Sequence, residues 1–172
     1  MADALNRYGL WDHLSAELRE SAMTEVATGC YPLDFGLLFE QVEFFADGEE
    51  LAEGGVDRFL RKLAPALVRY GVALEVETVR DADDYTVSIN GIRCVVLRSA
   101  DWESDPWALS TVRPLAVVNQ LLAAAGRSAL RAHTLYAGAN DGLVLLMDPR
   151  AAEAMRASGL FPEHELPAPA KL

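Results

Sequence analysis

Apolar residues at helical spacing predict a helix near the start of the chain. They recur every four positions from Leu14 to Val26, and Gly29 follows as a stop. The next stretch, residues 30–53, fits either a short helix after Asp34 or an extended segment.

A second amphipathic helix is predicted from Val56 to Tyr70, where one stripe of the helix is apolar and Gly71 is a typical stop. Pro65 lies inside this pattern. Because proline lacks a backbone N–H, it should kink the helix or split it.

Residues 72–98 change to the alternation that is typical of strands. Apolar and polar residues alternate from Val72 to Glu77, which predicts a half-buried strand. Asn90-Gly91 follows between two further alternating runs and predicts a two-residue type I′ turn. With this turn, three cross-strand pairs lie on the buried face of the hairpin: Ile89 with Ile92, Val87 with Cys94, and Tyr85 with Val96.

The remaining pattern predicts a loop, a helix, two strands and a last helix. The loop covers 99–111, the helix has Pro114 in its first turn and ends at Gly126, and the strands cover 130–137 and 143–147. The second strand is apolar throughout, so we expect it to be covered on both faces. Asp148-Pro149 should cap a helix that ends near Gly159, and a proline-rich tail over 161–172 should be loosely ordered.

These elements indicate an α+β fold with an antiparallel sheet and helices packed on one face. The order after an N-terminal helical region is helix, three strands, helix, two strands, helix. We expect a single domain over residues 1–160, with an acidic helical region at 1–55 and a sheet–helix core at 56–160.

Composition agrees with a protein that folds without disulfides or a bound metal. The chain has 172 residues, of which 51% are hydrophobic, and this length buries enough surface for a stable core. No apolar run reaches the length of a membrane span, and the first residues, MADALNRYGLWDHL, lack the pattern of an export signal. We therefore expect a cytoplasmic protein in which Cys30 and Cys94 are reduced.

Charge is concentrated in the first third of the chain. The net charge is −11, and residues 1–53 alone contribute −10. Such a field argues against nucleic acids and anionic membranes as partners and favours a basic protein. The densest stretch holds six acids in fourteen residues without a base: Glu40, Glu43, Asp47, Glu49, Glu50 and Glu53. It is a solvated surface or a docking face for a cationic protein; as a metal site it lacks the spacing of a calcium loop.

A second candidate binding segment combines tryptophan with acids: Asp101, Trp102, Glu103, Asp105 and Trp107. Tryptophan is frequent among the residues that dominate interface energies, and it contacts cations through its ring face. The alternative is that one or both rings fold back over the end of the sheet.

We predict no catalytic, cofactor-binding or metal-binding residue. Hairpin parity buries Cys94, and Cys30 has no histidine near it in sequence. His13, His133 and His164 share no metal-ligand spacing. The glycine-containing segment 138–142 is explained by a turn between two strands. An enzyme of unknown class remains a third interpretation, behind two binding functions.

Three segments resemble pieces of small bacterial immunity proteins, which neutralise polymorphic or contact-dependent toxins. These segments are Phe44–Val56, Val118–Leu122 and Ala139–Gly142. The resemblance implies an acidic inhibitor that binds a basic toxin domain without catalysis, with no cofactor. The element order is also similar to that of class I type III secretion chaperones, which are acidic homodimers that hold an effector. The two resemblances leave monomer and homodimer open.

Overall fold

The structure is a computed structural model that describes residues 1–33, 42–79 and 84–171. The α-helices are α1 (Ala2–Arg7), α2 (Ala16–Ala27), α3 (Gly48–Glu50), α4 (Val56–Val68), α5 (Pro106–Ala125) and α6 (Pro149–Ser158). Shorter helical turns are η2 (Leu51–Gly55), η3 (Ser99–Glu103) and η4 (Glu163–Glu165). The strands are β1 (Glu43–Phe45), β2 (Val76–Val79), β3 (Tyr85–Ile89), β4 (Ile92–Leu97), β5 (Arg131–Leu135), β6 (Leu143–Met147) and β7 (Ala168–Pro169).

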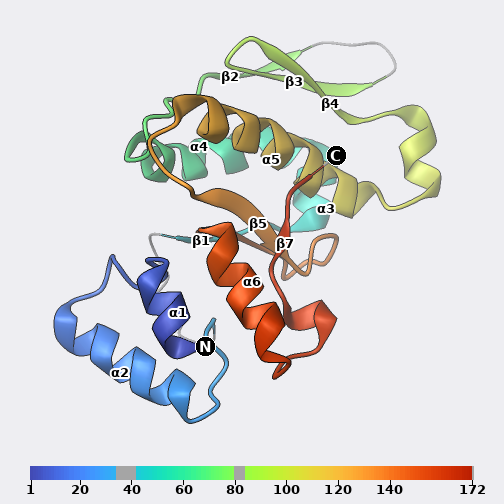
Figure 1. Ribbon diagram of the computed structural model, residues 1–172. Coiled ribbons are helices and arrows are strands. Elements are labelled where there is room, and N and C mark those ends of the chain that lie inside the picture. Colours follow the sequence, from blue (N-terminus) through green and yellow to red (C-terminus); the bar gives the residue numbers. More distant parts are fainter. Residues whose placement is uncertain (34–41, 80–83, 172) are drawn as a thin grey trace.

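The fold class is α+β, as predicted, and the strands form two antiparallel sheets. One sheet has the order β2-β3-β4, and the other has the order β1-β6-β5-β7. Helices α4 and α5 lie between the two sheets, whereas α1, α2 and α6 lie on the far side of the four-stranded sheet (Figure 1). The central strand β6 is therefore covered on both faces, as its unbroken apolar sequence predicts.

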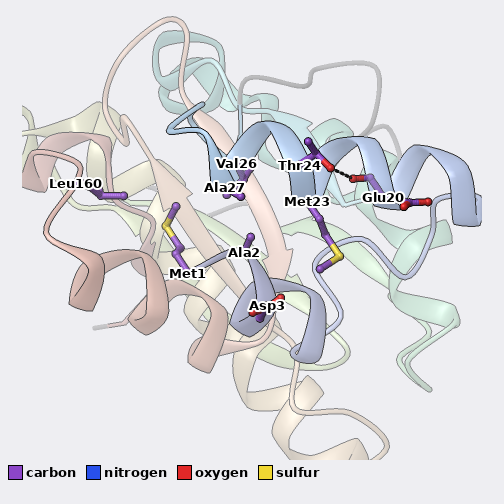
Figure 2. Close-up of a pocket in the computed structure, with 9 residues that line it drawn as sticks. All are labelled: Met1, Ala2, Asp3, Glu20, Met23, Thr24, Val26, Ala27 and Leu160. Atoms are coloured by element: carbon purple, nitrogen blue, oxygen red, sulfur yellow. Dashed lines mark hydrogen bonds between the residues drawn. The ribbon is translucent and has the colours of Figure 1, made fainter.

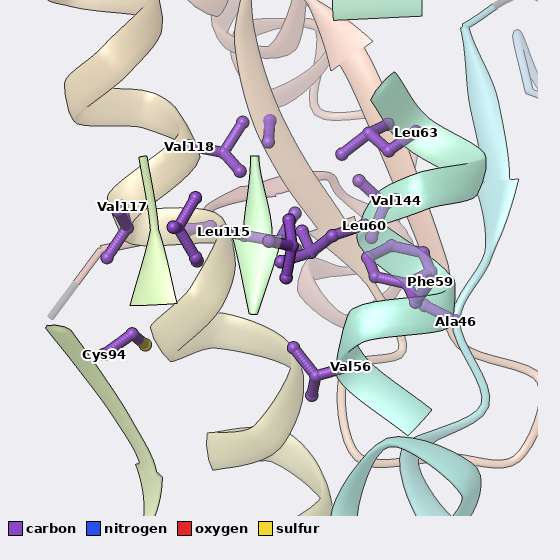
Figure 3. Packing of buried hydrophobic residues seen from close by; sticks show 14 of the residues in the cluster. Ala46, Val56, Phe59, Leu60, Leu63, Cys94, Leu115, Val117, Val118 and Val144 are labelled. Carbon is purple, nitrogen blue, oxygen red and sulfur yellow. The ribbon is translucent and has the colours of Figure 1, made fainter. Parts of the chain in front are cut away.

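Two apolar cores lie between these layers. The larger core joins α4 and α5 to both sheets, and side chains such as Leu60, Leu115 and Val144 meet in it (Figure 3). The smaller core lies between the four-stranded sheet and the N-terminal helices, around the fully buried Trp11. The helix predicted before Gly29 is α2, but Leu18 on its apolar stripe is 48% exposed.

The Asn90-Gly91 hairpin has the predicted turn, with φ of 50° and 77° at the two central residues. Two of the predicted pairs are confirmed, Ile89 with Ile92 and Val87 with Cys94. The third is wrong. The register shifts between residues 85 and 86, so that Tyr85 pairs with Leu97. The shift leaves the Tyr85 hydroxyl able to accept a hydrogen bond from the Val56 N–H at 3.2 Å.

Two further expectations for this region are wrong. Ile92 begins β4 directly after the turn and is 36% exposed instead of buried. The strand predicted from Val72 begins only at Val76. The residues before it are held by the turn itself, because the Asn90 side chain accepts from the Glu75 N–H and donates to the Ala73 carbonyl, both at 2.8 Å.

Helix α5 begins at Pro106, inside the predicted loop 99–111. Asp105 caps it by accepting from the Ala108 N–H at 3.0 Å, and Pro106 occupies the first turn, where its missing N–H costs nothing. Pro114 therefore lies inside the helix, as Pro65 lies inside an unsplit α4. By length and composition α5 alone among the described helices could cross a membrane, yet it packs between the two sheets.

The C-terminal segment is ordered, contrary to the loose tail predicted for it. Strand β7 pairs with β5, and Leu166 and Ala170 are buried. The Asn119 amide of α5 holds the segment by donating to the carbonyls of Ala132 and Ala170 at 2.9 and 3.1 Å. The prolines predicted a loosely ordered tail, but tertiary hydrogen bonds hold it against the sheet.

Candidate functional site

The acidic stretch builds a short, highly charged helical corner. Asp47 caps α3 by accepting a hydrogen bond from the Glu50 N–H at 3.0 Å. The chain turns within η2, where Gly54 has a φ of +105° that glycine adopts readily, and continues as α4. Leu51 and Ala52 face the core, which leaves the carboxylates of Glu49, Glu50 and Glu53 exposed.

This corner packs against the start of α5. A Cβ at position 48 would lie 2.9 Å from the Cβ of Trp107, so only glycine allows the approach. The Gly48 N–H donates to the Ala139 carbonyl at 3.1 Å, which also brings in the turn between β5 and β6. Segments that are far apart in sequence therefore meet at this end of the molecule (Figure 1).

The packing adds two carboxylates to the corner. Asp141 lies exposed in the β5–β6 turn, and the exposed Asp105 lies so close to that turn that a Cβ at Gly138 would be 3.2 Å from its Oδ1. We call the combined surface the acidic face, and its members are Asp47, Glu49, Glu50, Glu53, Asp105 and Asp141.

One cation borders the acidic face at a shallow hollow of about 290 Å³. The hollow is lined by Asp47, Glu49, Glu50, Glu53 and Arg58. Arg58 pairs with Glu50 at 3.2 Å, and both side chains are largely solvent-exposed. Such a pair stabilises little, and it leaves the negative field of the other three carboxylates uncompensated within the hollow.

Asp101 is one of the predicted site residues, but in the structure its carboxylate is bound by other residues of the fold. Its carboxylate forms a two-pronged ion pair with Arg113, in which Nη2 and Oδ1 are 3.2 Å apart, and it accepts from the Arg98 N–H at 2.8 Å. The Arg113 hydrogen bonds, followed by that from Arg98, lower the pKa of Asp101 to about 2. Both side chains of the pair are mostly buried, so this carboxylate is not free for a partner.

The two tryptophans have different environments. Trp107 is half-buried and packs against the larger core next to Gly48. Trp102 lies on η3 and is 55% exposed, and Glu103 beside it is exposed as well. The alternative of a ring folded onto the core therefore describes Trp107, whereas Trp102 stays open to solvent.

The other members of the predicted set do not join the acidic face. Glu43 lies on β1 and is half-buried, and its Oε2 has no hydrogen-bond partner among the described residues. Burial raises the pKa of this carboxyl. Glu40 lies outside the described residues.

The nucleophilic and metal-ligating side chains of the described residues do not gather at one site. Cys94 is buried, and burial raises its pKa to about 11, while Cys30 is exposed. In the described ranges no three His, Cys, Asp or Glu side chains come together as a metal site. A hollow of about 500 Å³ between α1, α2 and Leu160 is lined by Met1, Met23 and other small or apolar residues, with Asp3 and Glu20 as its only carboxylates (Figure 2).

Sequence reasoning found the acidic stretch but missed Asp141 and Arg58 as its neighbours. Asp141 is part of an Asn-Asp-Gly turn, and nothing in the local pattern says which helix that turn will meet. Comparisons with protein-family models, curated proteins and solved structures gave no match.

Proposed function

We propose that this chain is a non-catalytic binding protein that holds a basic protein partner against its acidic face, in the manner of an immunity protein that neutralises a toxin. The observation that supports this most is the packing together, at one end of the molecule, of three segments, 47–53, 105 and 141, whose carboxylates are mostly exposed. The resemblance of residues 44–56 and 139–142 to immunity proteins falls on two of these three segments.

Electrostatics explains what such a surface contributes. Carboxylates of one sign on an exposed face attract a cationic partner before contact and raise the association rate. Charges at the rim of an interface act mainly on association, and salt screens them beyond about 8 Å at physiological ionic strength. The acidic face should therefore set the speed of encounter and the choice of a basic partner.

Lasting contact requires an anchor in addition to charge. Trp102 is an exposed aromatic residue on η3, next to the exposed carboxylate of Glu103. A tryptophan that becomes buried at the centre of an interface commonly contributes about 2 kcal/mol or more. Trp102→Ala should therefore accelerate dissociation and leave the association rate nearly unchanged.

A pair of matched variants tests the role of the acidic face. Glu49, Glu50 and Glu53 are changed to Gln in one variant, and Glu17, Glu20 and Glu25 of α2 are changed to Gln in the other. All six side chains are exposed, so the two variants lose the same charge from different surfaces. Stopped-flow association is measured with a basic partner protein identified among the products of the adjacent genes. The first variant should associate more than about tenfold more slowly at low salt, and the second should stay near the wild-type rate. Equal rates in both variants would overturn the proposal.

A further inference from the structure

A further cavity, of about 490 Å³, lies at the opposite edge of the four-stranded sheet, and several basic residues line it. Arg131 and His133 alternate along β5, so they share the sheet face that α6 covers. β7 pairs with β5 at this edge, with His133 opposite Pro169, and Lys171 follows two residues later (Figure 1). Proline and alanine side chains from α6 and the C-terminal segment form much of the remaining wall.

The charges of this cavity do not cancel. Arg156 is held by Glu153 and Glu163, each at 3.4 Å. In the described ranges, Arg131 donates to the backbone carbonyls of Ser128 and Leu130 and makes no ion pair, and Lys171 makes none either. Within the described part of the chain, whose net charge over the full sequence is −11, these two positive charges at the cavity therefore have no carboxylate paired with them. A phosphate dianion has the charge that neutralises them, and arginine binds phosphate through two parallel hydrogen bonds.

The imidazole of His133 supplies a different kind of contact. Its Nδ1–H donates to the Arg131 carbonyl at 3.1 Å, because a carbonyl oxygen only accepts. In the neutral ring Nε2 is then an acceptor, and it has no partner among the described residues although the side chain is 99% buried. Burial lowers the pKa of His133 and so favours this neutral form. A ligand hydroxyl can donate a hydrogen bond to Nε2 of His133.

We propose that the cavity between β5, β7 and α6 binds a hydroxyl-bearing phosphate monoester, with the phosphate at Arg131 and Lys171 and a hydroxyl at His133. The cavity lies within the range of about 300–1,000 Å³ that small organic ligands occupy and is larger than inorganic phosphate requires. The apolar wall faces the carbon skeleton of the ligand. This site is separate from the acidic face and does not depend on its function.

The test uses NMR spectra of the full chain, in which the ring protons of His133 report on the cavity directly. Ribose 5-phosphate and inorganic phosphate are titrated separately to about 10 mM, where even a weak complex is populated. Ribose 5-phosphate should shift the His133 signals saturably and at lower concentration than inorganic phosphate. Lys171→Gln should weaken this binding at least about tenfold, as loss of a charge-assisted contact does. Lys62→Gln removes the same charge from an exposed position on α4 and should leave the binding unchanged.

Three results would overturn the proposal. One is the absence of any saturable shift with either probe. Equal affinity for the two probes would exclude the sugar and leave a site for the free ion. A saturable shift that is the same in wild type, Lys171→Gln and Arg131→Gln would place the ligand elsewhere. None of these results bears on whether a basic protein binds the acidic face.

Discussion

At the scale of single residues, Asp101 shows how an apparent binding residue serves the fold. Its pKa is about 2 because Arg113 and the Arg98 N–H hydrogen-bond to the carboxylate. Since the unfolded value is about 3.9, the stabilisation is present above pH 4 and is lost as the pH falls towards 2. Asp101→Asn should lower the free energy of unfolding by about 1–2 kcal/mol at pH 7, and by little near pH 2. Urea unfolding at several pH values measures this; a difference that does not depend on pH would contradict it.

Cys94 permits an equally direct test of burial. Its thiol is buried and has a pKa of about 11, against about 8.5 for a free cysteine, so thiolate is scarce at pH 8. In a Cys30→Ser variant, which leaves Cys94 as the single thiol, the native protein should react with a thiol reagent about two orders of magnitude more slowly than a free thiol. The same protein in denaturant should react at the free rate. Fast reaction without denaturant would contradict the register of the hairpin.

At the scale of elements, Asn90 links three strands. It provides a positive φ in the turn between β3 and β4, and its side-chain amide accepts from the Glu75 N–H and donates to the Ala73 carbonyl, just ahead of β2. Asn90→Ala should destabilise the protein by about 1–3 kcal/mol, because two hydrogen bonds and a favourable turn residue are lost. Asn90→Asp keeps the acceptor but loses the donor, so its stability should lie between that of the wild type and that of Asn90→Ala. Urea midpoints of the three proteins measure the order; equal midpoints would contradict it.

Local signals predicted the elements that local chemistry determines. Asn90-Gly91 predicted its turn, and Asp148-Pro149 predicted the start of α6. The same kind of signal at Asp105-Pro106 marks the start of α5, whereas the predicted helix had Pro114 in its first turn. β7 could not be predicted, because Ala168 and Pro169 form a strand only where β5 pairs with them and Asn119 holds the following residue, Ala170.

At the scale of the whole molecule, the sequence predicted where negative charge is dense but not what lies beside it. Residues 1–53 carry almost all of the net charge, and part of that stretch forms the acidic face. The meeting of Gly48 with Trp107 and with the β5–β6 turn depends on two sheets and a helix layer that no local pattern encodes. For the same reason the cations Arg131 and Lys171 became visible as neighbours only in the folded chain.

The salt dependence of association tests the proposed docking most directly. The association rate of the wild-type chain with a basic partner protein identified among the products of the adjacent genes is measured over a series of salt concentrations. Docking through the acidic face predicts a rate that falls steeply as salt rises, because the interacting charges are exposed and screened, while the dissociation rate changes much less. An association rate that does not change with salt would contradict the proposal and would reduce the acidic face to a solvated surface.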